Sequence, residues 1–143
     1  MILADHFRRC GLRLRSGKVK ILLVDASPTI RNLQKNVLKQ LGHTDFIEAE
    51  DGIQALAVFA EQTPDLVIVD WNMPNMDGIT LVRKIRERSK KIPLIMCTTE
   101  AEKKRVMEAI RAGVNNYIVK PFTVESLGRK ITETLEKART SAS

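Results

Sequence analysis

The apolar positions of the chain fall into two alternating patterns. Short runs without polar interruption are typical of strands that are covered on both faces of a parallel sheet. Between them, apolar residues recur at spacings of three and four, the period of an amphipathic helix. The short runs predict five strands, at residues 21–24, 46–49, 66–69, 93–97 and 117–119. The periodic segments predict helices at residues 28–41, 52–59, 79–85, 106–110 and 124–135.

Capping residues mark the ends of several predicted helices. Ser27 followed by Pro28 is the order expected of an N-cap with proline at the first helical position. Thr123 is the predicted N-cap of the last helix. Gly42 and Gly113 follow the last periodic residues of two other helices and therefore predict their C-terminal ends.

Strict alternation of strands and helices determines the fold class. Right-handed crossovers place the helices on both faces of the sheet, so we expect an α/β fold with a doubly wound, five-stranded parallel sheet. In such sheets ligands bind at the carboxyl ends of the strands, near the point where the strand order reverses. The functional residues are therefore expected at that edge.

Four of the predicted strands end in residues that carry chemistry. Asp25, Asp70, Thr98 and Lys120 follow the first, third, fourth and fifth strands. Each residue alone is compatible with a helix cap or a solvated side chain, but together they place two carboxylates, a hydroxyl and an ammonium on one edge. Two neighbouring carboxylates require a cation, which predicts Lys120, a divalent metal ion, or both. Oxygen ligands without His or Cys favour Mg²⁺ over Zn²⁺.

Length and composition predict one soluble domain. The chain has 143 residues, of which 43% are hydrophobic and 29% are charged. No apolar run reaches the roughly 18 to 20 residues that a membrane span needs, and residues 1–17 lack the apolar stretch of a secretory signal, so we expect a cytoplasmic protein. Cys97 lies in an apolar strand far from Cys10, which favours a reduced thiol over a disulfide.

The net charge of +7 is unevenly distributed along the chain. Residues 1–20 hold six cations and one acid, which leaves a net charge of +2 for the rest. Aromatic residues make up 4% of the chain and do not interleave with the basic run, so no nucleic-acid partner is expected. Residues 1–18 are predicted to be a disordered basic extension.

Four motifs carry a resemblance to a known family. They are ILLVD (21–25), DWNMPNMDG (70–78), CTTEAE (97–102) and NYIVKPF (116–122). In this order they resemble the receiver domain of two-component response regulators, and in particular the CheY-like receivers of chemotaxis. The resemblance covers residues 19–139 and leaves residues 140–143 as a C-terminal tail. It implies the flavodoxin-like strand order 2-1-3-4-5 that CheY-like receivers share.

The resemblance also implies a role for each residue at the predicted edge. Asp70 would accept a phosphoryl group from a sensor histidine kinase or a small acyl phosphate. Asp25, Asp70 and the backbone carbonyl of Asn72 would bind Mg²⁺, and Lys120 would pair with the phosphoryl oxygens. The Thr98 hydroxyl would bind the phosphoryl group, and Tyr117 would be the aromatic ring that switches position. The resemblance also implies a cis peptide bond before Pro121. Such a domain is no conventional enzyme, although it catalyses its own phosphorylation and dephosphorylation.

Ala26 departs from the family pattern, in which two adjacent acids follow the first strand. The missing carboxylate is the more direct metal ligand in the family, so we expect weakened Mg²⁺ affinity. Ala26 also raises an alternative, an atypical receiver that is never phosphorylated and acts as a protein-binding module. Haloacid-dehalogenase chemistry is disfavoured because Asn72 replaces the required second acid, and the anionic loop after Asp25 lacks the glycines of a phosphate-binding loop.

No effector domain is expected after the last helix, so output is predicted to come from docking. In CheY-like proteins the face of the fourth helix, fifth strand and fifth helix contacts the target. Lys103, Arg105, Tyr117 and Lys130 belong to that face here, although a simply solvated basic face is an equal interpretation. We expect a monomer that works through a kinase and one downstream target protein.

Overall fold

The computed structural model describes residues 19–142, and the predicted extension at 1–18 lies outside them. Five parallel strands form one sheet in the order β2-β1-β3-β4-β5, which confirms the predicted fold class and strand order. The strands are β1 (Lys20–Val24), β2 (Asp45–Ala49), β3 (Leu66–Val69), β4 (Leu94–Thr98) and β5 (Asn116–Val119).

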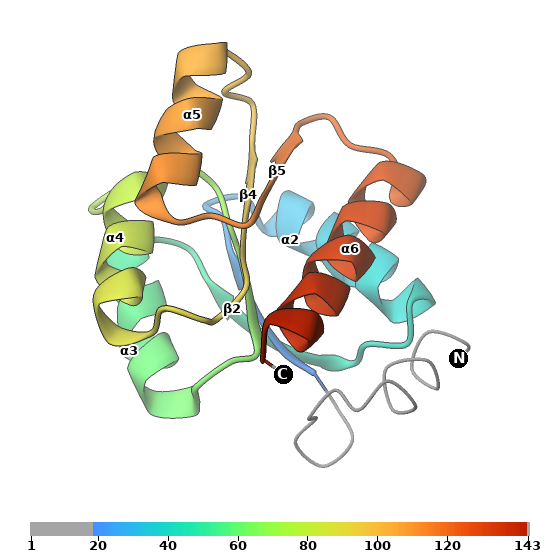
Figure 1. Ribbon diagram of the computed structural model, residues 1–143. Helices are drawn as coiled ribbons and strands as arrows, with labels where there is room; N and C mark the ends of the chain where they lie inside the picture. The colour runs from blue at the N-terminus through green and yellow to red at the C-terminus, as the bar shows by residue number, and fades with distance from the viewer. Residues whose placement is uncertain (1–18, 143) are drawn as a thin grey trace.

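Helices cover both faces of this sheet (Figure 1). One face carries α2 (Pro28–Gln40) and α6 (Val124–Ala142). The other carries α3 (Gly52–Gln62), α4 (Gly78–Arg88) and α5 (Lys103–Ala112). Within the described part of the chain, no helix is both long and apolar enough to cross a membrane.

The central strands are apolar throughout because each face of the sheet has its own core. Alternate residues of a strand point to opposite faces. In β1, Leu22 and Val24 join the core beneath α3, α4 and α5, whereas Ile21 and Leu23 join the core beneath α2 and α6. All four residues are at most 1% exposed, which explains why no polar residue interrupts the run.

The predicted caps form as the sequence indicates. The Ser27 hydroxyl accepts a hydrogen bond from the Ile30 amide at 3.3 Å, with Pro28 at the helix start. Thr123 and Ser126 exchange hydrogen bonds between side-chain oxygen and backbone amide at 2.9 and 3.0 Å, a reciprocal cap on α6. Gly113 ends α5 with a φ of 120°, a conformation that favours glycine.

Two details differ from the sequence-based expectation. The apolar positions of α2 predict that Leu33 faces the core, but Leu33 is 47% exposed and Gln34 is buried in its place. The helix is rotated so that its buried positions are Gln34, Val37 and Leu38. The last helix continues to Ala142, so most of the predicted tail at 140–143 is helical.

Strand register brings the predicted site residues together. Val24 pairs with Val69, so Asp25 and Asp70 leave adjacent strands side by side. Val119 pairs with Thr98 at the next strand boundary, and the Lys120 amide donates to the Thr98 carbonyl at 2.8 Å. The carboxyl edge therefore gathers Asp25, Asp70, Thr98 and Lys120.

Candidate functional site

Lys120 joins the two carboxylates at this edge. Its Nζ donates to Asp25 Oδ2 at 2.8 Å and to Asp70 Oδ2 at 3.1 Å. The side chain of Lys120 is 12% exposed, that of Asp25 3% and that of Asp70 11%, so the ion pairs are largely shielded from water. The lysine therefore offsets the repulsion between two carboxylates that the strand register forces together.

Backbone amides hold the other carboxylate oxygens. Asp25 Oδ1 accepts from the Ser27 amide at 2.9 Å, and Asp70 Oδ1 accepts from the Trp71 amide at 2.7 Å. All four carboxylate oxygens thus have a donor. Both side chains are fixed by hydrogen bonds to nearby backbone amides and face the same ammonium, which is the pre-organised geometry that a reactive carboxylate needs.

The environment of Lys120 favours its charged form. Burial alone would lower its pKa, but the hydrogen bond to Asp25 and the charges of Asp70 and Asp25 outweigh burial and raise the pKa above 10.5. Lys120 therefore carries a full positive charge at neutral pH.

Glu100 links the predicted switch residues through its backbone. Its amide donates to the Thr98 hydroxyl oxygen at 3.3 Å, and its carbonyl accepts from the Tyr117 hydroxyl at 2.6 Å. Thr98 is fully buried and Tyr117 is 8% exposed. Burial, followed by the charge of Glu100, raises the pKa of Tyr117 to about 12, so the phenol remains a hydrogen-bond donor.

A second cluster at the edge was not predicted from the sequence. The Glu100 side chain accepts from Asn72 Nδ2 at 3.0 Å and lies 3.8 Å from Arg105 Nε. The Arg105 guanidinium is 5.0 Å from the centre of the Trp71 ring, a cation–π contact. The position of Glu100, two residues after Thr98 at a strand end, is the signal that could have indicated it.

Gly78 is also part of the site, again without a sequence-based prediction. Its amide donates to the Trp71 carbonyl at 2.8 Å. A Cβ at this position would lie 2.1 Å from the Asp70 carbonyl oxygen and 2.9 Å from Trp71 Cα. The first residue of α4 must therefore be glycine for the backbone to approach Asp70 this closely.

The oxygen donors at the edge suit a magnesium ion better than a transition metal. Mg²⁺ in proteins is commonly bound by one or two carboxylates, keeps several waters and shares substrate phosphates. Asp25 and Asp70 provide two such carboxylates, while Ala26 provides none. Among the described residues, no cluster of three or more His, Cys, Asp or Glu side chains is arranged to hold a metal ion. An ion at this edge would therefore rely on the two carboxylates alone among such side chains, a donor set that fits Mg²⁺ with a small number of protein ligands.

The predicted docking face comprises α5, β5 and α6. Arg105 is engaged with Trp71 and Glu100, and Lys130 Nζ donates to the Tyr117 carbonyl at 2.6 Å, so neither is simply solvated. The elements of this face also expose large apolar side chains, namely Met107 and Ile110 in α5, Val119 at the end of β5 and Val124 at the start of α6.

The sheet topology and the lysine-bridged carboxylates together define a class of signalling domain. The family model of the response regulator receiver domain matches residues 21–132, and the chain belongs to this family. It is 46% identical to the chemotaxis protein CheY of Pseudomonas aeruginosa over 121 residues, covering 83% of this chain and 98% of the relative. It is 49% identical to the chemotaxis protein CheY1 of Helicobacter pylori over 116 residues, covering 79% and 94% of the two chains.

A solved structure agrees with the sequence relatives. The crystal structure of Vibrio cholerae CheY4 superposes with a TM-score of 0.76 at 34% identity, covering 82% of this chain and 98% of that one. The chain is therefore a CheY-like receiver domain of the response regulators. Receiver domains of this family generally bind Mg²⁺ at the phosphorylation site, and the family implies a histidine kinase and a downstream target as partners.

Proposed function

We propose that Asp70 accepts a phosphoryl group from the phosphohistidine of a sensor histidine kinase or from a small acyl phosphate. The observation that carries this proposal is the contact of Lys120 Nζ with both Asp70 and Asp25, 3.1 and 2.8 Å away. The resulting phosphorylated domain signals by docking to a partner protein. By analogy with its relatives, the process it serves is chemotaxis in the cytoplasm, and the domain acts as a monomer.

The chemistry of the step follows from the positions of the charges. A carboxylate oxygen of Asp70 forms the new bond to phosphorus, while the bond from phosphorus to the donor breaks and the donor keeps its electron pair. The phosphoryl oxygens carry the developing charge in this kind of transfer. Lys120 is placed to neutralise that charge, and the buried Thr98 hydroxyl can donate to the phosphoryl group once it is attached.

Asp25, Asp70 and the Asn72 carbonyl are the groups that we propose as ligands of Mg²⁺. When bound, the ion supplies further positive charge to the phosphoryl oxygens. Because Ala26 contributes no carboxylate, the site has one acid fewer than the family pattern and binds the ion more weakly.

The phosphorylation proposal is tested by intact-mass measurement after incubation with acetyl phosphate and Mg²⁺. The unmodified sequence is expected to gain the mass of one phosphoryl group. Asp70→Asn keeps the shape of the side chain but removes the nucleophilic charge, so this variant should remain folded and gain nothing. A gain that persists in Asp70→Asn would move the acceptor to another residue.

Thr98→Ala is expected to be phosphorylated but to transmit little of the change to α5 and α6. The wild-type hydroxyl can leave the Glu100 amide for the phosphoryl group, and Glu100 is also the partner of Tyr117. Alanine removes that connection. Amide chemical shifts of both proteins with beryllofluoride, a phosphoryl mimic, provide the measurement; equal shifts in α5 and α6 would contradict the coupling.

Ala26→Asp is expected to bind Mg²⁺ about tenfold more tightly. An added carboxylate about 4 Å from the ion attracts it by ~4 kcal/mol at an effective dielectric of ~20, but repulsion from Asp25 and Asp70 leaves about 1–2 kcal/mol. Trp71, the single tryptophan, adjoins the acceptor and can report binding by fluorescence. An unchanged affinity would mean that another group already completes the site.

The absent acid at Ala26 also supports a second function, a receiver that binds a partner without being phosphorylated. In that case neither acetyl phosphate nor a kinase would change the mass of the protein. The intact-mass experiment therefore separates the two functions directly.

A further inference from the structure

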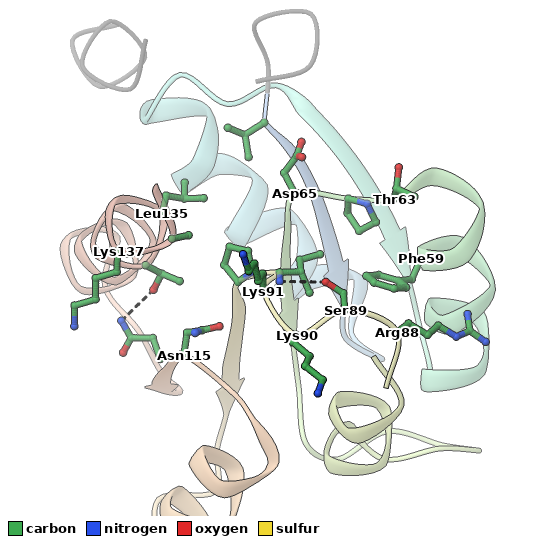
Figure 2. A pocket seen from close by; sticks show the side chains of 17 residues that line it. Phe59, Thr63, Asp65, Arg88, Ser89, Lys90, Lys91, Asn115, Leu135 and Lys137 are labelled. Carbon is green, nitrogen blue, oxygen red and sulfur yellow. Dashed lines mark hydrogen bonds between the residues drawn. The ribbon is translucent and has the colours of Figure 1, made fainter. Parts of the chain in front are cut away.

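A cavity of about 730 Å³ opens at the amino ends of the strands, at the opposite end of the sheet from Asp70. It lies between the loop before β3, the segment joining α4 to β4, the start of β5 and the last turns of α6 (Figure 2). This volume is within the range of small-molecule sites. Neither the phosphorylation site nor the predicted docking residues line it.

The rim of this cavity is positively charged. Its lining includes Arg88, Lys90, Lys91 and Lys137 but a single acid, Asp65. Figure 2 shows Arg88 and Lys137 on opposite sides, with Lys90 and Lys91 between them. None of the four cationic side chains makes an ion pair or hydrogen bond within the described residues. Asp65 is already engaged, because its Oδ2 accepts from the Lys20 amide at 2.9 Å.

This charge is concentrated here rather than spread over the domain. The lining has a net charge of +3, whereas residues 21–143 as a whole have +2, so the remainder of the folded part is slightly negative. Cations are common where a helix ends, because they offset its dipole. At the end of α4, however, Arg86 already donates to the Ser89 and Gly113 carbonyls at 2.8–3.1 Å. The further cations are not needed for that purpose.

The inner lining is apolar and includes Phe59, Ile92, Pro93 and Leu135. A matching ligand would combine an apolar part with several negative charges. The chain's own residues 1–18 do not match, because they carry five cations and one acid and would be repelled by the rim. We propose that the cavity binds a nucleoside polyphosphate, with its base on the apolar lining and its phosphates toward Lys90 and Lys91.

The test is calorimetric titration of the full chain with ATP, tripolyphosphate and adenosine, in EDTA and near-physiological salt. We expect ATP to bind one to one, tripolyphosphate at least about tenfold more weakly, and adenosine not measurably. Lys90→Ala with Lys91→Ala should weaken ATP binding about tenfold or more. The matched control is Lys84→Ala with Lys104→Ala, two exposed lysines without described partners away from the cavity, and it should stay within about twofold.

Amide chemical shifts locate the site independently. ATP should shift residues 88–93 and 134–138, and leave Asp25 and Asp70 unshifted. Equal loss of affinity in the control pair, or tripolyphosphate binding as tightly as ATP, would show diffuse charge attraction and overturn the proposal. Binding to phosphatidylglycerol vesicles without binding to ATP would also overturn the proposal. Phosphorylation by acetyl phosphate should be unchanged in both double variants, so the outcome is independent of the role of Asp70.

Discussion

Gly78→Ala is expected to destabilise the domain by about 3 kcal/mol or more and to impair phosphorylation. The added Cβ would lie 2.1 Å from the Asp70 carbonyl oxygen, and the contacted atoms are backbone atoms that cannot rotate away. Overpacking of this kind typically costs about 1–3 kcal/mol, and more where the neighbours are rigid. Because the strained segment carries Asp70, the proposed acceptor itself should be displaced.

Urea denaturation measures the change, and the chain provides a matched control. Gly128 lies inside α6, where an added Cβ would meet only side-chain atoms at 3.7–3.9 Å, ordinary contact distances. Gly128→Ala should therefore be neutral or stabilising by roughly 0.5–1 kcal/mol, the usual gain of alanine over glycine in a helix. If Gly78→Ala unfolds at the same urea concentration as the control, the close approach to Asp70 is not a structural requirement.

Lys120→Ala is expected to cost about 3 kcal/mol in the absence of metal and to prevent efficient phosphorylation. Removing one partner of a buried ion pair leaves uncompensated charge, which typically costs about 3–5 kcal/mol. Here two carboxylates, Asp25 and Asp70, lose their shared cation at once. Because Asp70 and Lys120 are slightly exposed to water, we expect the loss of stability to be at the lower end of that range.

The pH dependence of stability should identify this cause. In the wild type the pKa of Lys120 is raised above 10.5 on folding, so its contribution is fully present below that value and is lost as pH rises through the folded-state pKa. The Lys120→Ala variant lacks this alkaline loss, so the difference in stability between wild type and variant should narrow as pH rises through the folded-state pKa of Lys120. Lys104→Ala, an exposed lysine, is the control; equal stabilities of the two variants at neutral pH would contradict the account.

The fold could be predicted because its determinants are local. Uninterrupted apolar runs, helical periodicity and caps such as Ser27 and Gly113 each specify an element without reference to distant residues. The orientation of α2 could not be predicted in the same way. Leu33 and Gln34 are adjacent, and which of them is buried depends on packing between α2 and the sheet, where Gln34 lies beside the Cys97 thiol.

The candidate site shows the same division between local and tertiary information. The strand ends alone predict that Asp25, Asp70, Thr98 and Lys120 share one edge, because parallel strands have a common carboxyl edge. The contacts of Glu100 with Asn72 and Arg105, and the steric requirement at Gly78, join residues from different loops and helices. These contacts depend on tertiary distances, and the sequence offers only the position of Glu100 near a strand end as a signal for them.

The central claim, that Asp70 is the phosphoacceptor, is tested most directly by chemical localisation of the phosphoryl group. Borohydride reduces an aspartyl phosphate to homoserine and so marks the modified residue permanently. After treatment with acetyl phosphate and Mg²⁺, peptide mass spectrometry should find homoserine at position 70 and aspartate at all other aspartate positions. Homoserine at another position, such as 25, or unmodified aspartate throughout, would contradict the claim.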